Sequence, residues 1–385
     1  RRDVTGAAAF AQAEELLRNR VPIGHVPTYA AIARDEAGMK RTLYVLSVLL
    51  LVACGLAAAA IGLGFLGRFH PAFDSLSHFR LHLAALLAVG ATGLISTGFR
   101  REAFAGLALA TAAFFVTPGT WLDTVAGNQA KASATPDERA TYRLLHLNAR
   151  FDNPDPERFL SLIARLRPDV VTVNEVSAMW RQRLETLAAA YPHRIVCEAR
   201  GLVGGVAILS RRPFAEGSSP GCVDGGTLAV ASVDFAGQPV SVAALHLYWP
   251  WPFEQPAQID RIAPRLSDLP DAAILTGDFN AARWSQTVRT IAAAARMEDA
   301  GPVGPSWLPR ALPDVLRRSV GLGIDHVLAG TGLVVTSVER LDDVGSDHLP
   351  VMTEFWVPTQ PKPEASGSTV VLRPGKGAAT SPPGA

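Results

Sequence analysis

The sequence predicts an α+β protein, a four-layer α/β/β/α sandwich of two mixed β-sheets that is preceded by three transmembrane helices. Long apolar runs without a charged residue are confined to residues 42–122, and short apolar runs alternate with helical patterns across residues 142–357. Several strand-like runs in the second region follow one another without an intervening helix. That order argues against a purely parallel sheet and favours two mixed sheets with helices on their outer faces.

The length of 385 residues exceeds the roughly 250–300 residues at which a single core stops growing, so more than one unit is expected. Composition divides the chain into five regions. We expect a cytoplasmic amino-terminal segment (1–41), three transmembrane helices (42–122), a linker (123–141), the α+β domain (142–357) and a disordered tail (358–385).

The apolar run at residues 42–66 has no charged side chain and is long enough to cross roughly 30 Å of bilayer hydrocarbon. The runs at 81–99 and 103–122 are shorter and richer in glycine, and we expect them to cross as well. A secretory signal peptide is the alternative for the first run. Such peptides begin close to the amino terminus, whereas about forty residues precede this run, so a membrane span is favoured.

Positive charges predict the orientation, because Lys and Arg collect on the cytoplasmic flanks of membrane spans. Seven of them precede the first run, and Arg100 and Arg101 lie between the second and third runs. With three spans, everything after Leu122 is then extracytoplasmic, in a multi-pass protein of a bacterial inner or plasma membrane. Arg68 and Arg80 in the first loop oppose this orientation.

Two cysteines of the soluble region bear on the compartment. An exported domain would allow Cys197 and Cys222 to form a disulfide, whereas in a reducing compartment they would be two buried thiols. The sequence leaves both alternatives open.

Within the α+β domain, eight short runs rich in Val, Leu, Ile and Ala have the length and composition of strands. They begin at residues 143, 169, 204, 227, 240, 272, 324 and 350. Four stretches between them carry apolar residues at helical spacing, as Phe159, Ile163 and Leu166 do in the first. These predicted helices are residues 156–167, 179–190, 255–266 and 287–296.

Polar and ionisable residues stand where the predicted strands end. Asn148 ends the first strand, Glu175 the second and His246 the fifth, while Asp278 and Asn280 end the sixth. A charged group buried beside a core costs about several kcal/mol, because the ion loses its hydration, unless the group is paired or bound to a metal. Five such residues at four strand ends therefore indicate a site. Asp325, Asp347 and His348 beside the closing strands complete it.

The residue types suggest a reaction. Carboxylates and a carboxamide are hard oxygen ligands, which suit Mg²⁺, with Mn²⁺ as an alternative, and no Cys is positioned for zinc. Nearby imidazoles can contact a phosphoryl group or transfer protons, so the set predicts hydrolysis of a phosphoester. Each residue alone has an ordinary explanation, such as an Asx-turn for Asn280 or a satisfied histidine for His246. Eight coincidences together are far less plausible.

Five motifs in order resemble the endonuclease/exonuclease/phosphatase superfamily, which includes pancreatic deoxyribonuclease, apurinic endonucleases, neutral sphingomyelinases and inositol-phosphate phosphatases. They are the strand-ending Asn148, the pair Asn174–Glu175, GDFN at 277–280, IDH at 324–326 and SDHLP at 346–350. The resemblance covers roughly residues 142–357 and departs from the family at Asn174, where Gln is usual. It implies the sandwich fold and a metal-dependent phosphoesterase.

The resemblance also implies a role for each residue. Glu175 would be the principal metal ligand, supported by Asp347 and, directly or through water, by Asn148. Asp278 would position or deprotonate the attacking water, and Asn280 would hold the phosphoryl oxygens. His348, oriented by Asp325, would face the scissile phosphate, and His246 would flank it from the other side. We assign His146 and His326 to structure, because we expect them to point away from the site face.

The substrate is predicted from charge and aromatic residues. Residues 143–354 contain 20 Arg, no Lys and 24 acids, so this domain offers a nucleic acid little electrostatic attraction. Tyr248, Trp249, Trp251 and Phe253 follow His246 and suit a lipid or a bilayer interface. Three spans before such a domain also resemble a membrane-bound branch of the family that is linked to glycopeptide resistance and polyprenyl-pyrophosphate processing.

We therefore expect a lipid-linked phosphate or pyrophosphate as the substrate and membrane lipids as partners. A membrane-anchored nuclease and a catalytically silent binding module are the alternatives. The sequence indicates no protein partner.

Overall fold

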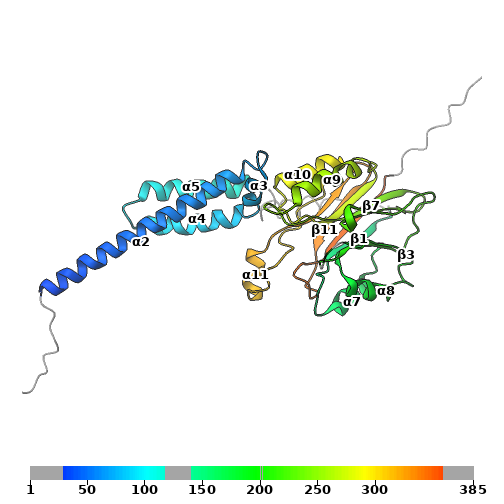
Figure 1. Cartoon of the computed structure of the whole chain (residues 1–385), viewed down its shortest axis with the longest axis horizontal. Coiled ribbons are helices and arrows are strands. Elements are labelled where there is room, and N and C mark those ends of the chain that lie inside the picture. The colour runs from blue at the N-terminus through cyan, green and yellow to red at the C-terminus, as the bar shows by residue number, and fades with distance from the viewer. Residues whose placement is uncertain (1–28, 118–139, 200, 202, 359–385) are drawn as a thin grey trace, which may run out of the picture. The chain divides into compact units, whose positions relative to one another are not determined.

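The computed structural model describes residues 29–117, 140–199, 201 and 203–358, and it divides into two units (Figure 1). One unit comprises Arg1–Phe65 and Phe79–Thr117, and the other comprises Leu66–His78 and Pro118–Ala385. The predicted tail and all but the last two residues of the predicted linker lie outside the described residues, apart from residue 358. So does most of the predicted amino-terminal segment.

The first unit consists of helices α2 (Tyr29–Gly64), α4 (Arg80–Leu94) and α5 (Arg100–Val116). The three helices share a small apolar core to which each contributes. Its buried members are Ile61, Ala84, Leu87, Ala110 and Ala113. The helices form where the three apolar runs predict them.

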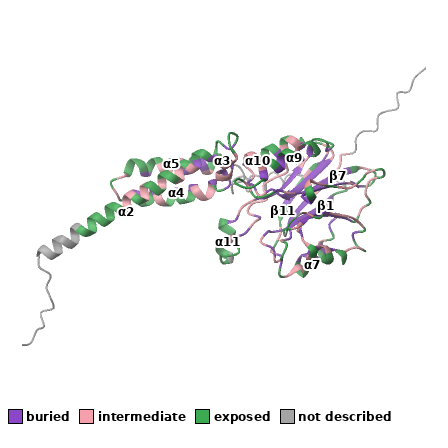
Figure 2. Cartoon of the chain, viewed as in Figure 1, coloured by how far each residue is buried: buried purple, intermediate pink, exposed green. Residues whose placement is uncertain are grey.

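The prediction of three membrane spans was wrong in number. Within the described residues, one helical stretch, Gly38–Gly64, is long and apolar enough to cross a membrane. Helices α4 and α5 have 15 and 17 residues, and a rise of about 1.5 Å per residue leaves them short of the roughly 30 Å of hydrocarbon. Leucine and valine side chains along Gly38–Gly64 are largely exposed, as Figure 2 shows for α2. This exposure suits an apolar surrounding.

The second unit is built on two mixed six-stranded sheets. The first sheet has the strand order β11-β12-β1-β2-β4-β3, and the second has the order β5-β6-β7-β8-β10-β9. The strands are β1 (Tyr142–Asn148), β2 (Val170–Val176), β3 (His193–Val196), β4 (Gly205–Ser210), β5 (Gly221–Val223), β6 (Leu228–Asp234), β7 (Pro239–His246), β8 (Ala273–Asp278), β9 (Glu298–Asp299), β10 (Asp325–Ala329), β11 (Val334–Arg340) and β12 (Val351–Trp356).

Helices cover the outer face of each sheet, which gives the predicted four layers. The helices are α3 (Pro71–Ser77), α7 (Pro156–Leu166), α8 (Ala178–Glu185), α9 (Gln255–Ser267), α10 (Gln286–Ala295) and α11 (Asp314–Val320), with a 3₁₀ turn η1 (Asp224–Gly226). Helices α7 and α8 pack on the first sheet, and α9 and α10 on the second (Figure 1). A third core fills the space between the sheets, and the central strands are buried in Figure 2.

The eight predicted strands and four predicted helices of this unit are all present, with ends shifted by a few residues. The largest shift is in α8, which ends at Glu185 rather than at Ala190. Strands β3, β5, β9 and β11, and helices α3 and α11, were not predicted. Each of these strands lies at the edge of a sheet, where the side chains are half-buried and the alternation of apolar residues is weak.

Strand register brings the predicted site residues to one end of both sheets. In the first sheet Asn148 pairs with Asn174 across the parallel strands β1 and β2. In the second sheet Asp278 pairs with His246 on one side and with Asp325 on the other. Parallel strands end at the same edge, so these side chains converge.

A segment that is far from the two sheets in sequence also belongs to the second unit. Leu66–His78 packs on this unit, and the buried Asp74 accepts hydrogen bonds from the backbone N–H groups of Gln286 (2.6 Å) and Thr287 (2.9 Å). These groups open helix α10, whose first N–H groups have no partner within the helix. The indole of Trp284 donates to the carbonyl of Ser77 at 2.6 Å. Asp74 therefore completes the amino-terminal cap of α10.

We expect Asp74→Ala to lower the free energy of unfolding of the second unit by about 2 kcal/mol, because a charged cap and its two hydrogen bonds are lost. Urea unfolding of the detergent-solubilised chain, followed by tryptophan fluorescence, measures this. The exposed Asp271→Ala is the matched control and should cost less than about 0.5 kcal/mol. Equal stability of the two variants would contradict the capping role.

The structure also decides the state of the two soluble-region cysteines. Cys197 and Cys222 form a disulfide that links positions 25 residues apart. Cys54 is a free cysteine. Disulfides persist in oxidising compartments, so this bond is relevant to the compartment in which the second unit lies.

Candidate active site

Glu175 owes its orientation to a bulge in strand β2. Between Asn174 and Val176 the pairing with β4 shifts register, and Glu175 adopts the left-handed conformation with φ of 60°. Such backbone is costly for a residue with a side chain and persists where its surroundings hold it. The carboxylate accepts hydrogen bonds from the Asn148 amide (3.0 Å) and from the N–H of Phe151 (2.9 Å). The bulge thus turns a carboxylate out of the strand at the sheet edge.

Asp278 lies at the centre of the site. Its carboxylate accepts hydrogen bonds from the Asn148 amide (2.9 Å) and from the N–H of Asn280 (2.8 Å). The Nε2 atoms of two imidazoles approach the same oxygen, His348 at 3.6 Å and His246 at 3.8 Å. Asn148 therefore links Glu175 on the first sheet to Asp278 on the second.

His348 and Asp325 form a buried acid–imidazole pair. The Nδ1 atom of His348 lies 2.8 Å from Asp325, which leaves Nε2 directed at Asp278. The other oxygen of Asp325 lies 3.2 Å from Nε2 of His146. The N–H groups of Ile324 and Asp325 donate to the Ser306 hydroxyl, which fixes the start of β10.

The remaining predicted residues lie around this centre. Asn280, with φ of 47°, donates its side-chain amide to the carbonyl of Leu247 (2.8 Å). Asp347 is half-buried beside Ser346, whose hydroxyl donates to the carbonyl of Asn148 and accepts from the N–H of His348. All eight predicted residues thus converge at one end of the sandwich.

The surroundings of Asp278 and His246 shift their pKa values in opposite directions. Burial raises the pKa of Asp278 to about 7, the nearby His348 opposes that rise and Asp325 adds to it. Burial lowers the pKa of His246 to about 4, and the positive charge of His348 contributes. At neutral pH His246 is therefore uncharged, and Asp278 is poised to accept or release a proton.

The pKa values of the buried pair, His348 and Asp325, also shift in opposite directions. Burial alone lowers the pKa of His348, but Asp325 and Asp278 outweigh it and raise that pKa to about 10. Burial alone raises the pKa of Asp325, but the two histidines outweigh it and the net shift is downward. At neutral pH the pair is an imidazolium and a carboxylate, so a positive donor faces Asp278.

Comparison with known proteins identifies the family. The model of the endonuclease/exonuclease/phosphatase family matches residues 145–348, more than half of the chain. The chain belongs to the endonuclease/exonuclease/phosphatase family. The chain is accordingly a metal-dependent hydrolase of phosphoester bonds.

Several solved structures resemble the chain more distantly. An endonuclease/exonuclease/phosphatase from Beutenbergia cavernae is 22% identical with a TM-score of 0.45, covering 57% of this chain and 72% of its own. D. rerio TDP2 complexed with single-strand DNA product is 19% identical (TM-score 0.45; 56% and 99%). Sphingomyelinase C from Streptomyces griseocarneus is 15% identical (TM-score 0.39; 56% and 99%). These values say nothing about the substrate of this chain. A comparison with curated proteins finds no match.

Glu175 and Asp347 have the donor chemistry for the cation that this family requires. Burial raises the pKa of Glu175, and the negative charge of Asp347 adds to that rise. Both side chains are half-buried, and carboxylates are the hard oxygen ligands that a divalent cation prefers. Asn148 turns its amide nitrogen toward Glu175 and Asp278. Its amide oxygen accepts a hydrogen bond from the N–H of Arg150 at 3.0 Å.

Another group has metal-binding residue types: atoms of Asp278, Asp325 and His348 lie within 4.8 Å of one another. Both oxygens of Asp325 already face imidazoles, and the Nδ1 of His348 is engaged by Asp325. These three atoms of the group are therefore already engaged by protein partners.

Sequence reasoning missed His146. It was expected to point away from the site, but it lies 3.2 Å from Asp325, and its other nitrogen lies 3.2 Å from the hydroxyl of Thr172. His146 and Asn148 are two residues apart on one strand and so share a face, which was the signal available. His326 does turn away, with Nε2 2.8 Å from the carbonyl of Ala281. A further buried contact joins the hydroxyls of Thr172 and Thr276 at 2.7 Å.

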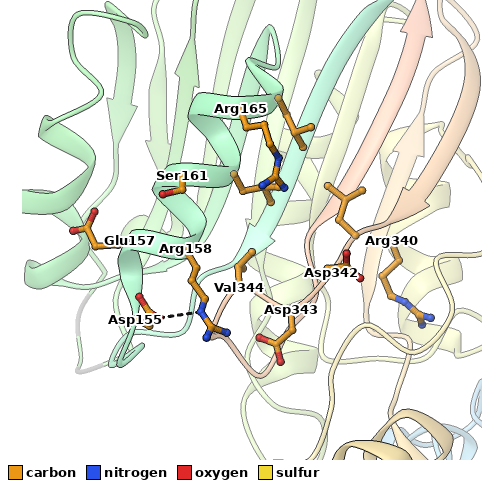
Figure 3. A pocket seen from close by; sticks show the side chains of 12 residues that line it. Asp155, Glu157, Arg158, Ser161, Arg165, Arg340, Asp342, Asp343 and Val344 are labelled. Carbon is orange, nitrogen blue, oxygen red and sulfur yellow. Dashed lines mark ion pairs between the residues drawn. The ribbon is translucent and has the colours of Figure 1, made fainter.

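A polar cavity of about 690 Å³ opens between α7 and the segment after β11 (Figure 3). Figure 3 shows charged side chains of both signs around it, with Arg158 paired to Asp155. Asp343, also in its wall, is paired with Arg317 at 2.6 Å. None of the eight predicted residues lines this cavity.

Proposed function

We propose that this chain is a membrane-anchored, Mg²⁺-dependent phosphoesterase that hydrolyses a phosphate ester or pyrophosphate of a lipid, of the polyprenyl or phospholipid type, outside the cytoplasm. The observation that carries the proposal is Asp278, a buried carboxylate that two imidazoles approach and that Asn148 links to Glu175, which with Asp347 forms the proposed cation-binding pair. A water held by Asp278 would attack a phosphorus atom beside that pair.

Each side chain has a task that follows from its charge. Asp278 accepts a proton from the water, because burial brings its pKa near neutrality. The imidazolium of His348, held by Asp325, donates a hydrogen bond to a phosphoryl oxygen, and the neutral His246 contacts the phosphate from the other side. A divalent cation at Glu175 and Asp347 supplies charge neutralisation of the phosphoryl oxygens.

Two features support a lipid substrate over a nucleic acid. The aromatic residues that follow His246 are exposed, from 38% at Tyr248 to 66% at Trp249, as suits a bilayer interface. The unit has more acids than arginines and no lysine between residues 143 and 354. A nucleic acid would therefore gain little from counterion release.

Two features support an extracytoplasmic catalytic unit. The disulfide Cys197–Cys222 suits an oxidising compartment. The segment Leu66–His78 follows the candidate span directly and packs on the catalytic unit, so both must lie on one side of any membrane that α2 crosses. Helices α4 and α5 then cross together or not at all. A single span would therefore give the same orientation as the three predicted ones.

The proposed activity is tested on the full chain in lipid nanodiscs with a panel of phosphoesters: a polyprenyl pyrophosphate, a phospholipid, a nucleotide and plasmid DNA. We expect phosphate release from a lipid substrate with Mg²⁺, less with Mn²⁺ and none in EDTA. Glu175→Gln should lower turnover by at least about 100-fold, because a charged ligand is lost. Plasmid nicking in physiological salt without lipid turnover would establish the nuclease instead. Absence of all turnover would leave a binding module.

Topology is tested by labelling with a membrane-impermeant maleimide. Arg68→Cys in the Leu66–His78 segment and Glu216→Cys in the catalytic unit each introduce a thiol at an exposed position. In a Cys54→Ser background, we expect both to react in intact cells. Reaction at one position and protection at the other would show that the two segments lie on opposite sides.

A further inference from the structure

An apolar cavity lies directly beside the catalytic centre. Its volume is about 760 Å³, within the roughly 300–1,000 Å³ typical of small-molecule sites. One wall is the loop from Leu247 to Glu254, and the other is formed by the described residues Ala199, Gly201, Val203 and Gly204. Apolar side chains dominate the lining, chiefly Val203, Leu247, Trp249 and Phe253.

His246 joins this cavity to the site. The residue lines the cavity, and its Nε2 lies 3.8 Å from Asp278. The neighbouring Leu247 also lines it and accepts the hydrogen bond of Asn280 through its carbonyl. A substrate whose phosphate contacts His246 therefore has an apolar space next to that phosphate.

A disulfide and a close backbone approach lie at the two ends of this second wall. At one end, the disulfide from Cys197 ties it to β5. At the other end, Gly204 (φ of 85°) runs so close to Val176 and Ser177 that a Cβ there would lie 2.6 Å from their backbone atoms. These contacts restrain the backbone at Cys197 and at Gly204.

The aromatic wall is connected to the membrane-proximal part of the chain. The Ser75 hydroxyl donates to the carbonyl of Trp251 at 3.1 Å, and the rings of His70 and Trp251 are in edge contact. Ser75 and His70 belong to the segment that begins at Leu66, two residues after α2 ends at Gly64. The loop is thus held by the segment that emerges from the candidate membrane span.

Charge distinguishes the possible occupants. Among the described lining residues, Glu254 is the one carboxylate and no Lys or Arg is present. These described lining residues would offer a polynucleotide no cation to neutralise its phosphates. Hydrocarbon requires none, and its transfer from water into an apolar cavity is favourable.

We propose that this cavity binds the hydrocarbon adjacent to the phosphate of a lipid-linked phosphoester, with Val203 and Trp249 on opposite walls. This inference rests on the proposed function. It adds that the site selects substrates by the apolar group on the phosphate, and that the chain of the lipid leaves the bilayer beside the aromatic loop.

The test measures inhibition of hydrolysis of a water-soluble diester, bis(4-nitrophenyl) phosphate, by the full chain in nanodiscs with Mg²⁺. Ethyl phosphate, dodecyl phosphate and thymidine 5′-phosphate are the inhibitors. We expect dodecyl phosphate to inhibit at a concentration at least about tenfold lower than ethyl phosphate. Val203→Glu should reduce this ratio to below about threefold, because a carboxylate would face the hydrocarbon. Trp249→Ala is the second variant and should also reduce it.

Val334→Glu is the matched control, since Val334 is exposed to a similar degree (38% against 45%) and lies at the end of β11 away from the site. It should retain the wild-type ratio, and partition of dodecyl phosphate into the nanodisc cancels between variants. An unchanged ratio in both Val203→Glu and Trp249→Ala would overturn the inference, as would stronger inhibition by thymidine 5′-phosphate than by dodecyl phosphate. If no phosphoester is hydrolysed, the proposed function fails, and calorimetric titration of dodecyl phosphate into the same variants still tests the cavity.

Discussion

Asp278→Asn is expected to reduce kcat/KM for phosphoester hydrolysis by about 1,000-fold, the largest effect on activity that we foresee from an isosteric change. The asparagine keeps the shape of the side chain and can still accept the N–H of Asn280. It cannot take a proton from water. The loss should therefore fall mainly on kcat, with KM little changed.

The pH profile provides an independent readout. A base works in its deprotonated form, so wild-type activity should fall as the pH drops through the pKa of Asp278. Burial raises that pKa to about 7, and a cation bound nearby lowers it, so the acid limb should lie at or below about pH 7. Asp278→Asn should lose this limb. Asp271→Asn, an exposed aspartate that ends no strand, is the control and should retain full activity. A loss of less than tenfold in Asp278→Asn would remove it from the role of base.

Most of the catalytic residues could be predicted because they interrupt regular patterns. Asn148, Glu175, His246 and Asp278 each end a run of buried apolar residues, and such endings are costly without a purpose. The β-bulge at Glu175 could not be predicted, because the same letters fit an uninterrupted strand. His146 was missed through a wrong count of alternation, although its spacing from Asn148 puts both on one face.

The parts of the fold that escaped prediction depend on contacts between distant segments. Asp74 and Gln286 are 212 residues apart, and nothing local in either segment indicates that one caps the other. The prediction of the number of membrane spans was wrong for a different reason. Apolar composition alone does not distinguish a helix of 15 or 17 residues from one long enough to cross a bilayer.

Asp325→Asn is expected to cost the catalytic unit about 3 kcal/mol or more of unfolding free energy at neutral pH. Asp325 is 1% exposed and faces two imidazoles, and removing one partner of a buried ion pair leaves the other charge uncompensated. His348 would then lose its proton or remain as a buried cation. Either outcome withdraws the positive donor that faces Asp278, so activity should fall together with stability.

The sign of the pH dependence separates this role from a loss of packing. The pKa of His348 is raised from 6.5 to about 10, so the stability that the pair contributes is complete below about pH 6.5 and is lost as the pH rises through about 10. The pKa of Asp325 is lowered from its ordinary 3.8, so its contribution is present above about pH 4 and is lost as the pH falls. The difference in unfolding free energy between wild type and Asp325→Asn should therefore be largest between about pH 4 and 6.5 and shrink toward pH 10. Urea unfolding at several pH values measures it, and a difference that is constant with pH would mean that Asp325 acts through shape rather than charge.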